Sequence, residues 1–316
     1  MQFTTKIPIQ KSSFPIDYDS KILLIGSCFA ENIGEKFEYF KFQNTINPFG
    51  IIFNPISIEK IVARCVHQMA FTEADIFFHN DLWHCFEVHS ELSHPDKDFF
   101  LEKLNQIRVD LYRQISELSQ VLITYGTSWV YRNIENNQIV ANCHKVPQKQ
   151  FVKELLSVEN LQQSIQNTIT LIRGVNPNCQ FIFTISPVRH IKDGFAENTR
   201  SKAHLITALH NTIEDSTLNE SYFPSYEIMM DELRDYRFYA SDMLHPNQMA
   251  IDYIWERFAE TYFTADCIAI MEEVDSIQKG ENHRPFNPNS EQHQKFLVHL
   301  NQKKLNLTER FPKINF

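Results

Sequence analysis

One stretch near the start of the chain restricts the possible folds more than any other. Residues 22–25 are four consecutive branched apolar residues, and Gly26, Ser27 and Cys28 follow them directly. Such a run without polar alternation is typical of a strand buried on both faces, and the glycine then indicates a turn into a helix. A strand, turn and helix in this order hold a small nucleophile at the rim of a sheet. We therefore take this turn as the candidate active site.

Three later apolar runs repeat the pattern. They lie at residues 121–125, 179–185 and 222–230, and segments with a single apolar stripe separate them. A repeated order of strand, helix and strand is typical of a parallel sheet covered on both faces. Ligands of open α/β sheets bind beyond the carboxyl ends of the strands. The turn that follows the first of these runs, Gly126-Thr127-Ser128, is therefore expected beside the Gly26 turn.

Two segments depart from this rhythm. Residues 71–97 alternate polar and aromatic residues, which predicts a hairpin inserted into the domain. This segment contains four histidines, but carboxylates or cysteines at ligand spacing do not accompany them, so we favour ordinary hairpin histidines over a metal site. We expect one α/β domain over residues 1–264 and a C-terminal extension over residues 265–316, with an amphipathic helix at 291–305.

Composition and charge narrow the classes of function. The net charge of −9 has the wrong sign for a surface that binds nucleic acid. The six cysteines form no Cys-x-x-Cys pair, as is typical of reduced thiols in a cytosol. The first residues lack the features of a signal peptide, and the apolar runs are too short to cross a membrane. We therefore expect a cytoplasmic protein without a cofactor, a nucleic-acid partner or a membrane attachment.

A candidate base lies near the other end of the α/β region. Asp242 and His245 precede an apolar-striped helix at 249–263, and at this spacing both side chains can face one direction. An imidazole held by a carboxylate can remove the proton of a thiol or hydroxyl. Because the ends of parallel strands meet at one edge of a sheet, Cys28 and His245 can meet there.

The oxyanion of a tetrahedral intermediate needs hydrogen-bond donors. The candidates are the backbone N–H groups of the nucleophile and of Gly50 and the hydroxyl of Thr127 or Ser128. Taken alone, Gly50 is equally well explained as an ordinary turn glycine. The polar segment 142–145 either lines the same cleft or forms an exposed loop.

Several of these motifs together resemble a known family. Residues 26–30, Gly-Ser-Cys-Phe-Ala, resemble the signature that names the GSCFA family, and three later segments resemble its other blocks: Asn-Cys-His-Lys at 142–145, Ser-Pro-Val-Arg-His at 186–190 and Asp-Met-Leu-His-Pro at 242–246. The resemblance covers about residues 21–263. The family is similar in turn to the SGNH (GDSL-type) hydrolases. This implies a three-layer α/β/α sandwich with a central parallel sheet and the chemistry of an esterase, lipase or acyltransferase.

The resemblance also orders the candidate nucleophiles. The SGNH pattern begins Gly-Asp-Ser-Leu, often followed by Thr-Glu, so matching Gly26 and Glu31 to it places Cys28 at the nucleophile and Ser27 at the aspartate. A thiolate at a helix N-terminus near an imidazole has a lowered pKa and is a good nucleophile. Cys28 is therefore the first choice and Ser27 the alternative.

The remaining blocks match to different degrees. Asp242 and His245 match the Asp-x-x-His block without alteration, and Gly50 resembles the oxyanion glycine of the second block. Ser128 stands where the third block has an asparagine. A hydroxyl reaches less far than an amide, so the resemblance implies an oxyanion hole that is weaker or that also uses Asn142.

The leading hypothesis is an SGNH-like esterase or acyltransferase that acts on an acyl ester of a polar substrate, such as a carbohydrate. Cys28 or Ser27 would attack the acyl carbonyl, and His245, oriented by Asp242, would act as base and then as acid. Substrate contacts are expected from His144, Arg189 and His190. One alternative is a non-catalytic protein that keeps the fold and binds a polar ligand, and a weaker one is a cysteine peptidase-like hydrolase.

Overall fold

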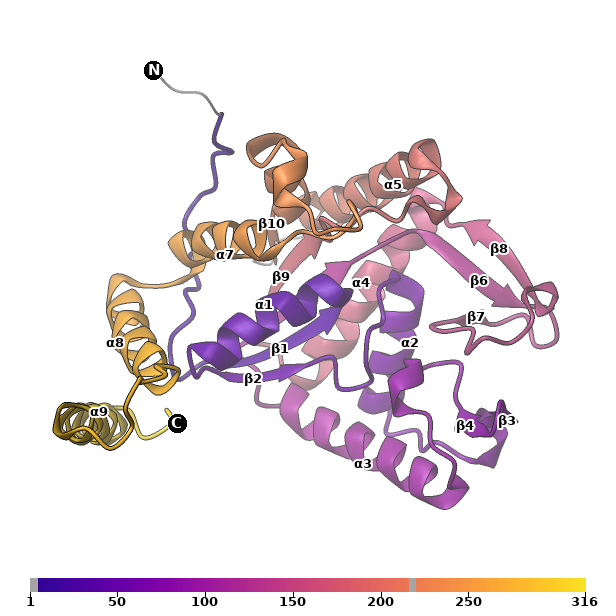
Figure 1. Cartoon of the computed structure of the whole chain (residues 1–316). Coiled ribbons are helices and arrows are strands. Elements are labelled where there is room, and N and C mark those ends of the chain that lie inside the picture. The colour runs from indigo at the N-terminus through magenta and orange to yellow at the C-terminus, as the bar shows by residue number, and fades with distance from the viewer. Residues whose placement is uncertain (1–4, 216–219) are drawn as a thin grey trace.

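A central parallel sheet organises the computed structural model, which describes residues 5–215 and 220–316. The sheet has the strand order β10-β9-β5-β1-β2, and all neighbouring strands are parallel. Its strands are β1 (Lys21–Gly26), β2 (Gln43–Ile46), β5 (Gln120–Tyr125), β9 (Gln180–Ile185) and β10 (Glu220–Phe223). Helices flank the sheet, as Figure 1 shows. The predicted α/β fold with a parallel sheet is confirmed.

Alternate residues of β1 enter two separate hydrophobic cores. Leu23 and Ile25 pack in the core shared with α2 (Pro55–Val66), α3 (Lys97–Ile115), α4 (Val158–Val175) and α5 (Phe195–Glu214). Ile22 and Leu24 pack on the other side, with α1 (Cys28–Tyr39), α7 (Gln248–Tyr262) and α8 (Ala265–Glu281). Successive side chains of a strand point to opposite faces, so a strand covered on both faces needs an unbroken apolar run.

Polar caps determine where the helices at the sheet's carboxyl edge begin. The Ser27 side chain accepts a hydrogen bond from the Phe29 N–H and caps α1. Asn54 caps α2, in which Pro55 is the first residue, and Asn247 caps α7. Each cap satisfies one of the N–H groups that lack a partner within the helix.

The inserted hairpin is present. Strands β3 (Phe77–His79) and β4 (Leu82–His84) pair in antiparallel fashion. The two turn residues between them, Asn80 and Asp81, both have positive φ, which matches the right-handed twist of the strands. A second small sheet has the order β7-β6-β8 and consists of β6 (Trp129–Asn133), β7 (Ile139–Val140) and β8 (Phe151–Leu155).

The strand predicted at 222–230 is wrong beyond residue 223. Strand β10 ends at Phe223, and a short α6 (Ser225–Glu227) and a π-helix (Ile228–Glu232) follow. Pro224 has no N–H to continue the ladder. The apolar residues after it are nevertheless buried, because one face of this helical turn packs against the α1 and α7 side of the sheet. Burial without strand pairing explains why the apolar run was misleading.

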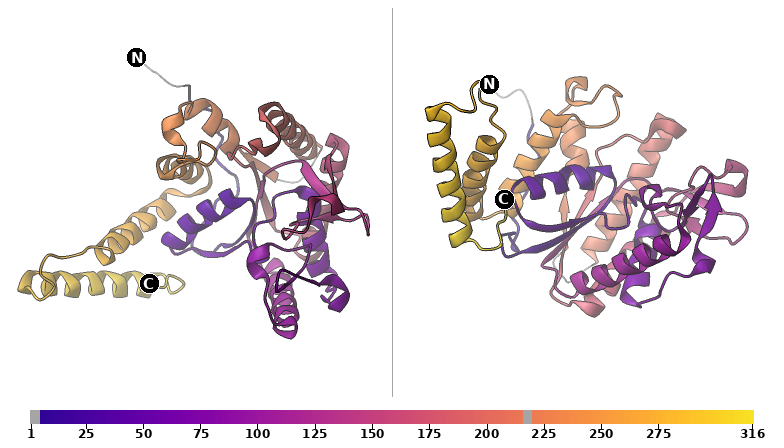
Figure 2. Two further views of the ribbon diagram at one scale, coloured as in Figure 1. Left: turned by 45° about the vertical axis from the view of Figure 1, so that its right-hand side comes forward. Right: turned by 60° about the horizontal axis from the view of Figure 1, so that its bottom comes forward.

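The C-terminal segment is helical. Helices α8 and α9 (Glu291–Arg310) lie side by side at the edge of the molecule (Figure 2). Leu300 and Leu307 of α9 pack in the same core as Val274 and Ile277 of α8. Short 3₁₀-helices complete the secondary structure at Glu73–Asp75, Ser90–Leu92, Gln148–Gln150, Ile191–Asp193 and Tyr236–Phe238. Within the described residues, none of the helices has the length and apolar character needed to cross a bilayer.

Candidate active site

Three turns meet at the carboxyl edge of the sheet. Gly26 is in register with Thr124 of β5, which is in register with Thr184 of β9. Gly26, Thr124 and Thr184 thus lie side by side across the sheet. Two residues after them in the sequence come Cys28, Gly126 and Ser186, respectively. The turn after β5 therefore lies beside the turn after β1, as the sequence predicted.

The backbone at Gly26 passes very close to β5. Its φ is +145°, and a Cβ at this position would lie 2.2 Å from the Thr124 carbonyl oxygen. The Gly26 N–H donates to the Asn47 side-chain oxygen at 2.9 Å, and the Ser27 N–H donates to the Thr124 carbonyl at 3.0 Å. Only glycine tolerates this combination of backbone angle and close approach.

Ser27 and Cys28 have different environments although they are neighbours. Ser27 is 1% exposed, and its Oγ accepts the Phe29 N–H at 3.3 Å. Cys28 is the first residue of α1 and is partly exposed. Cys28 is therefore partly open to solvent, whereas the serine hydroxyl is enclosed and serves as the helix cap.

The charge environment of the Cys28 thiol contains opposing influences. Burial and the carboxylate of Glu31 raise its pKa. The N–H groups of Cys28 and Phe29 at the helix start and the ammonium of Lys202 act in the opposite direction. Burial is the largest of these influences, so the pKa of Cys28 is raised above its ordinary value, and the lowered pKa expected for a thiol at a helix N-terminus is not found.

Asp242 and His245 form a close pair. The Asp242 Oδ2 lies 2.6 Å from the His245 Nδ1, and its Oδ1 accepts the N–H groups of Leu244 and His245 at 2.9 and 3.0 Å. These backbone bonds, with the bond to the His245 ring, lower the pKa of Asp242 to about 2. An ionised carboxylate can only accept, so Nδ1 carries the proton and Nε2 is left to act as a base.

Arg189 connects this pair to the turn after β9. Its Nη2 donates to the Met243 carbonyl at 2.5 Å, and its N–H donates to the Leu244 carbonyl at 3.3 Å. The guanidinium lies 4.3 Å from the centre of the Tyr239 ring. The contacts of Arg189 with Met243 and Leu244 hold the Asp242 loop at the sheet's carboxyl edge; its expected contact with substrate stays a prediction.

His190 lies in the same region. Its ring stacks on Phe53 with centroids 5.8 Å apart, and its Nε2 would be 3.3 Å from a Cβ at Gly126. This nitrogen is buried and has no hydrogen-bond partner within the described residues. Burial lowers the pKa of His190 to about 3, and the charges of Lys202 and His245 act in the same direction. The imidazole is therefore neutral and electrostatically coupled to both groups.

The Gly50 N–H, an expected oxyanion donor, is already occupied. It donates to the Asn47 carbonyl at 2.7 Å within the loop. The φ of Gly50 is +73°, and a Cβ here would lie 2.3 Å from the His89 Cβ. The glycine is explained by this turn and by its close approach to the inserted segment.

The hydroxyls of Thr127 and Ser128 are also occupied. The Thr127 Oγ1 lies 2.8 Å from the Ser201 Oγ, and the Ser128 Oγ donates to the Ser201 carbonyl at 3.1 Å. Ser128 is fully buried and Thr127 is 7% exposed. Both side chains hold α5 against the end of β5.

Asn142 and His144 lie under the inserted hairpin. The Asn142 side-chain oxygen accepts the His144 N–H at 2.8 Å. His144 is 3% exposed, its Nε2 lies 2.7 Å from the Cys85 carbonyl, and its ring centroid is 4.7 Å from that of His84. Burial lowers the pKa of His144 to about 4. Among residues 5–215 and 220–316, no three His, Cys, Asp or Glu side chains are placed to hold a metal ion.

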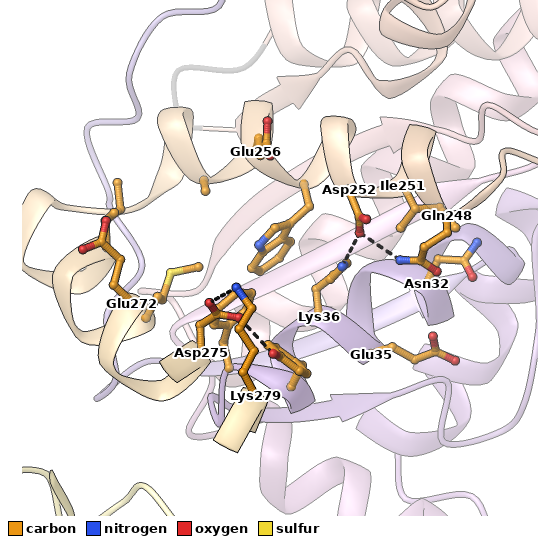
Figure 3. Close-up of a pocket in the computed structure, with 16 residues that line it drawn as sticks. Asn32, Glu35, Lys36, Gln248, Ile251, Asp252, Glu256, Glu272, Asp275 and Lys279 are labelled. Atoms are coloured by element: carbon orange, nitrogen blue, oxygen red, sulfur yellow. Dashed lines mark hydrogen bonds and ion pairs between the residues drawn. The ribbon is translucent and has the colours of Figure 1, made fainter. Parts of the chain in front are cut away.

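A groove runs along α1, α7 and α8 (Figure 3). Asn32 lines it one helical turn after Cys28, and Gln248 lines it three residues after His245. Lys36 and Asp252 form an ion pair across it. Cys28 and His245 are not among its lining residues. The groove therefore begins close to the strand-end site but is a separate feature.

Lys202 is the charged residue at this edge that the sequence reasoning missed. It is 1% exposed, and its Nζ donates to the carbonyls of Gly126 and Ser186, each at 2.7 Å. A signal was present in the sequence, since Lys202 stands three and seven residues before the buried Leu205 and Leu209, on one helical stripe.

The chain belongs to the GSCFA family. The model of that family matches residues 21–258, which is most of the chain. A second model, described as GSCFA domain protein, C-terminal domain, matches residues 274–316. No curated protein matches the sequence.

Two solved structures are similar at low identity. One is a carbohydrate esterase family 3 protein from Talaromyces cellulolyticus, with 9% identity and a TM-score of 0.37 over 80% of this chain and 99% of that chain. The other is a mutant acetyl esterase with an acetate ion, with 12% identity and a TM-score of 0.34 over 81% and 99%.

Proposed function

We propose that the protein is an SGNH-like esterase or acyltransferase that uses a thiol nucleophile. Cys28 is the nucleophile, His245 the general base and Asp242 the residue that orients His245. The observation that carries the proposal is the 2.6 Å contact between the Asp242 carboxylate and the His245 Nδ1. Arg189 ties the loop that bears this pair to the turn after β9, at the edge where the accessible thiol begins α1.

The proposed reaction proceeds in two halves. The His245 Nε2 takes the Cys28 proton, and the thiolate attacks the acyl carbonyl carbon to form a tetrahedral oxyanion. The intermediate collapses to a thioester, and the alcohol leaves with the proton held by His245. Water or an acceptor alcohol then attacks the thioester, gives its proton to His245, and the thiolate leaves and recovers a proton.

Of the oxyanion donors that the sequence suggested, this proposal keeps the backbone N–H of the nucleophile. Gly50, Thr127 and Ser128 are engaged within the fold. The N–H groups of Cys28 and Phe29 lie at the start of α1, where they stabilise negative charge on the thiol sulfur. The Cys28 N–H at this helix start is therefore the proposed principal donor.

A second candidate function is supported by the same occupied donors. A protein with the same fold that binds a polar ligand without chemistry needs no oxyanion hole. It would also need no reactive thiol, so thiol chemistry separates the two candidates.

Three alanine variants, assayed on short-chain acyl esters, test the proposal. Cys28→Ala should lower kcat/KM by about 10³-fold or more, because the nucleophile is removed. Cys143→Ala is the matched control, since Cys143 is also a partly exposed free thiol. Ser27→Ala should cost stability through the lost cap, by about 1 kcal/mol, and leave the thioester chemistry in place.

Mass spectrometry supplies a direct readout. Wild-type protein mixed with an activated ester should carry one acyl group on Cys28. Hydrolysis that persists unchanged in Cys28→Ala would overturn the thiol mechanism. Absence of both turnover and acylation across a panel of acyl esters would favour the ligand-binding candidate.

A further inference from the structure

A buried ammonium group lies at the junction of two strand ends. Lys202 reaches from α5 to the carbonyl oxygens of Gly126 and Ser186, each 2.7 Å from its Nζ. Gly126 directly follows β5, and Ser186 directly follows β9. The charged end of Lys202 is therefore held at the edge of the sheet by two backbone groups that cannot move independently.

The sheet register places this charge at the edge where α1, which bears Cys28, begins. Gly26, Thr124 and Thr184 form one row across β1, β5 and β9. Cys28, Gly126 and Ser186 follow two residues after these three positions. The two carbonyls that hold Lys202 thus belong to the same carboxyl edge of the sheet from which α1 begins.

The surroundings of Lys202 contain no paired carboxylate. Within the described part of the chain, Lys202 forms no salt bridge. The charged or titratable groups that face it are Cys28 of α1, His190 after β9 and Glu227 of α6. Glu227 already accepts hydrogen bonds from the Tyr222 hydroxyl at 2.9 and 2.7 Å, and the Tyr226 ring lies 5.6 Å from the Nζ.

Such a position is unfavourable for a purely structural lysine. Burial of an ammonium that has no carboxylate in ion-pair contact costs several kcal/mol, and burial lowers the pKa of Lys202 to about 7. A neutral amide could tie the same two carbonyls at a smaller cost. The position therefore favours a residue whose charge is used. Of the two acidic groups that face Lys202, Glu227 accepts hydrogen bonds from Tyr222, whereas the thiolate of Cys28 would be an anion without such a partner.

We infer that Lys202 is a positioning residue that stabilises the thiolate of Cys28 through its charge while it holds the turns after β5 and β9. This role rests on the proposed function only in that Cys28 is the nucleophile. Lys202 transfers no proton: the thiol proton passes to His245, and the ammonium keeps its bonds to the two carbonyls.

The rate of Cys28 alkylation by iodoacetamide, followed site by site with mass spectrometry across pH, tests this role. The full-length wild type is compared with Lys202→Met, which removes the charge. The rate near neutral pH should fall by about tenfold and the pH profile should shift upward, because an unpaired thiolate is less stable. Ser201→Ala is the matched control, since Ser201 packs on the same turn without a charge, and its profile should equal that of the wild type.

A second variant separates charge from tethering. Lys202→Gln keeps hydrogen-bond donors near the two carbonyls but carries no charge, so it should alkylate as slowly as Lys202→Met. Wild-type profiles in both folded variants would overturn the inference. A second outcome separates this inference from the proposed function. If Cys28 is alkylated more slowly in both Lys202 variants but Cys28→Ala keeps full esterase activity, the proposed function is overturned, whereas the effect of the Lys202 charge on Cys28 stands.

The reciprocal effect can be measured without any change at Lys202. A thiolate and an ammonium stabilise each other, so if the Cys28 thiolate is populated while Lys202 titrates, loss of the thiol lowers the pKa of the lysine. The Lys202 pKa, followed by NMR in full-length protein, should therefore fall in Cys28→Ala. An unchanged lysine titration would overturn the inference even if neither Lys202 variant folds.

Discussion

The turns after β1 and β5 are similar in sequence and different in use. Gly26-Ser27-Cys28 and Gly126-Thr127-Ser128 both place a glycine and two small polar residues at the end of a buried strand. The first turn enters α1 and leaves Cys28 partly exposed. The second leads into β6, and its hydroxyls are bonded to Ser201 of α5.

The difference between the two turns shows that a polar residue at the end of a strand does not by itself indicate a binding or catalytic site. Ser128 is fully buried because a helix 73 residues further along the chain covers it. Cys28 stays accessible, and the groups that influence its charge come from its own helix start and from Lys202. The partner that packs on a turn, and not the turn's own residues, decides whether it is open to a substrate.

The largest predicted effect separates the two glycines. Gly26→Ala should cost about 3–5 kcal/mol or prevent folding, because its Cβ would lie 2.2 Å from the Thr124 carbonyl oxygen at φ +145°. Gly126→Ala should cost about 1–2 kcal/mol, since its nearest neighbour is the Phe53 Cβ at 2.9 Å. Urea denaturation measures both. Gly174→Ala is the control, because nothing lies within 4 Å of its Cβ, and equal losses at Gly26 and Gly126 would contradict the comparison.

The next prediction concerns chemistry at the first turn. Asp242→Asn should lower kcat/KM on acyl esters by about 10²–10³-fold, because the His245 ring loses the acceptor that keeps Nδ1 protonated. Ser128→Ala should change kcat/KM by less than about threefold, since its hydroxyl bonds to Ser201. Steady-state kinetics of the two variants at one pH give the answer. A large loss in Ser128→Ala with unchanged stability would show that the second turn also takes part in the chemistry.

A smaller effect is predicted for the contact that closes the second turn. Ser201→Ala should lower the free energy of unfolding by about 1–2 kcal/mol, because Thr127 and the Ser128 N–H lose a buried partner. Ser164→Ala on α4 is the matched control, since the buried Ser164 hydroxyl has no hydrogen-bond partner within the described residues. Its removal should change the stability little. Urea denaturation of the wild type and both variants measures the free energies of unfolding, provided that the slopes of the transitions are equal. Equal losses of stability in Ser201→Ala and Ser164→Ala would contradict the prediction.

The smallest effect is a dependence of stability on pH through His190. The pKa of His190 is lowered to about 3 from its usual 6.5, so the unfolded chain binds more protons than the folded chain between these values. Stability from this group is fully present above pH 6.5 and is lost as the pH falls toward 3. The wild type should lose about 1 kcal/mol relative to His190→Gln as the pH falls from about 6.5 to about 5.5. Parallel stability curves for the two proteins would show that His190 titrates normally.

Much of the framework could be predicted because its signals are local. Four branched apolar residues specify a strand buried on both faces, and the β1 side chains do alternate between two cores. The cap Asn54 and the following Pro55 are a local start signal for α2, and the alternating segment predicted the inserted hairpin. The turn into a helix expected after Gly26 is also local, since the Ser27 side chain caps α1 at its first residue, Cys28. These features depend on residues close together in sequence.

The candidate oxyanion donors could not be predicted correctly from the sequence. Gly50, Thr127 and Ser128 were chosen as free donors from residue type and from the family pattern. Whether a donor is free depends on what packs against it, and these three are bonded to Asn47 and Ser201. Lys202 escaped notice for the same reason, since its partners are two carbonyls on other strands.

The sequence alone determined the parallel α/β framework, the turn at Gly26 and the pairing of Asp242 with His245 three residues later. Each follows from backbone preference, burial pattern or short-range geometry. Only the tertiary structure decided that Cys28 is accessible while Ser27 and Ser128 are enclosed, and that Lys202 supplies a charge at the same edge. Accessibility and electrostatic environment arise when distant segments pack together, and no local pattern encodes which segments these will be.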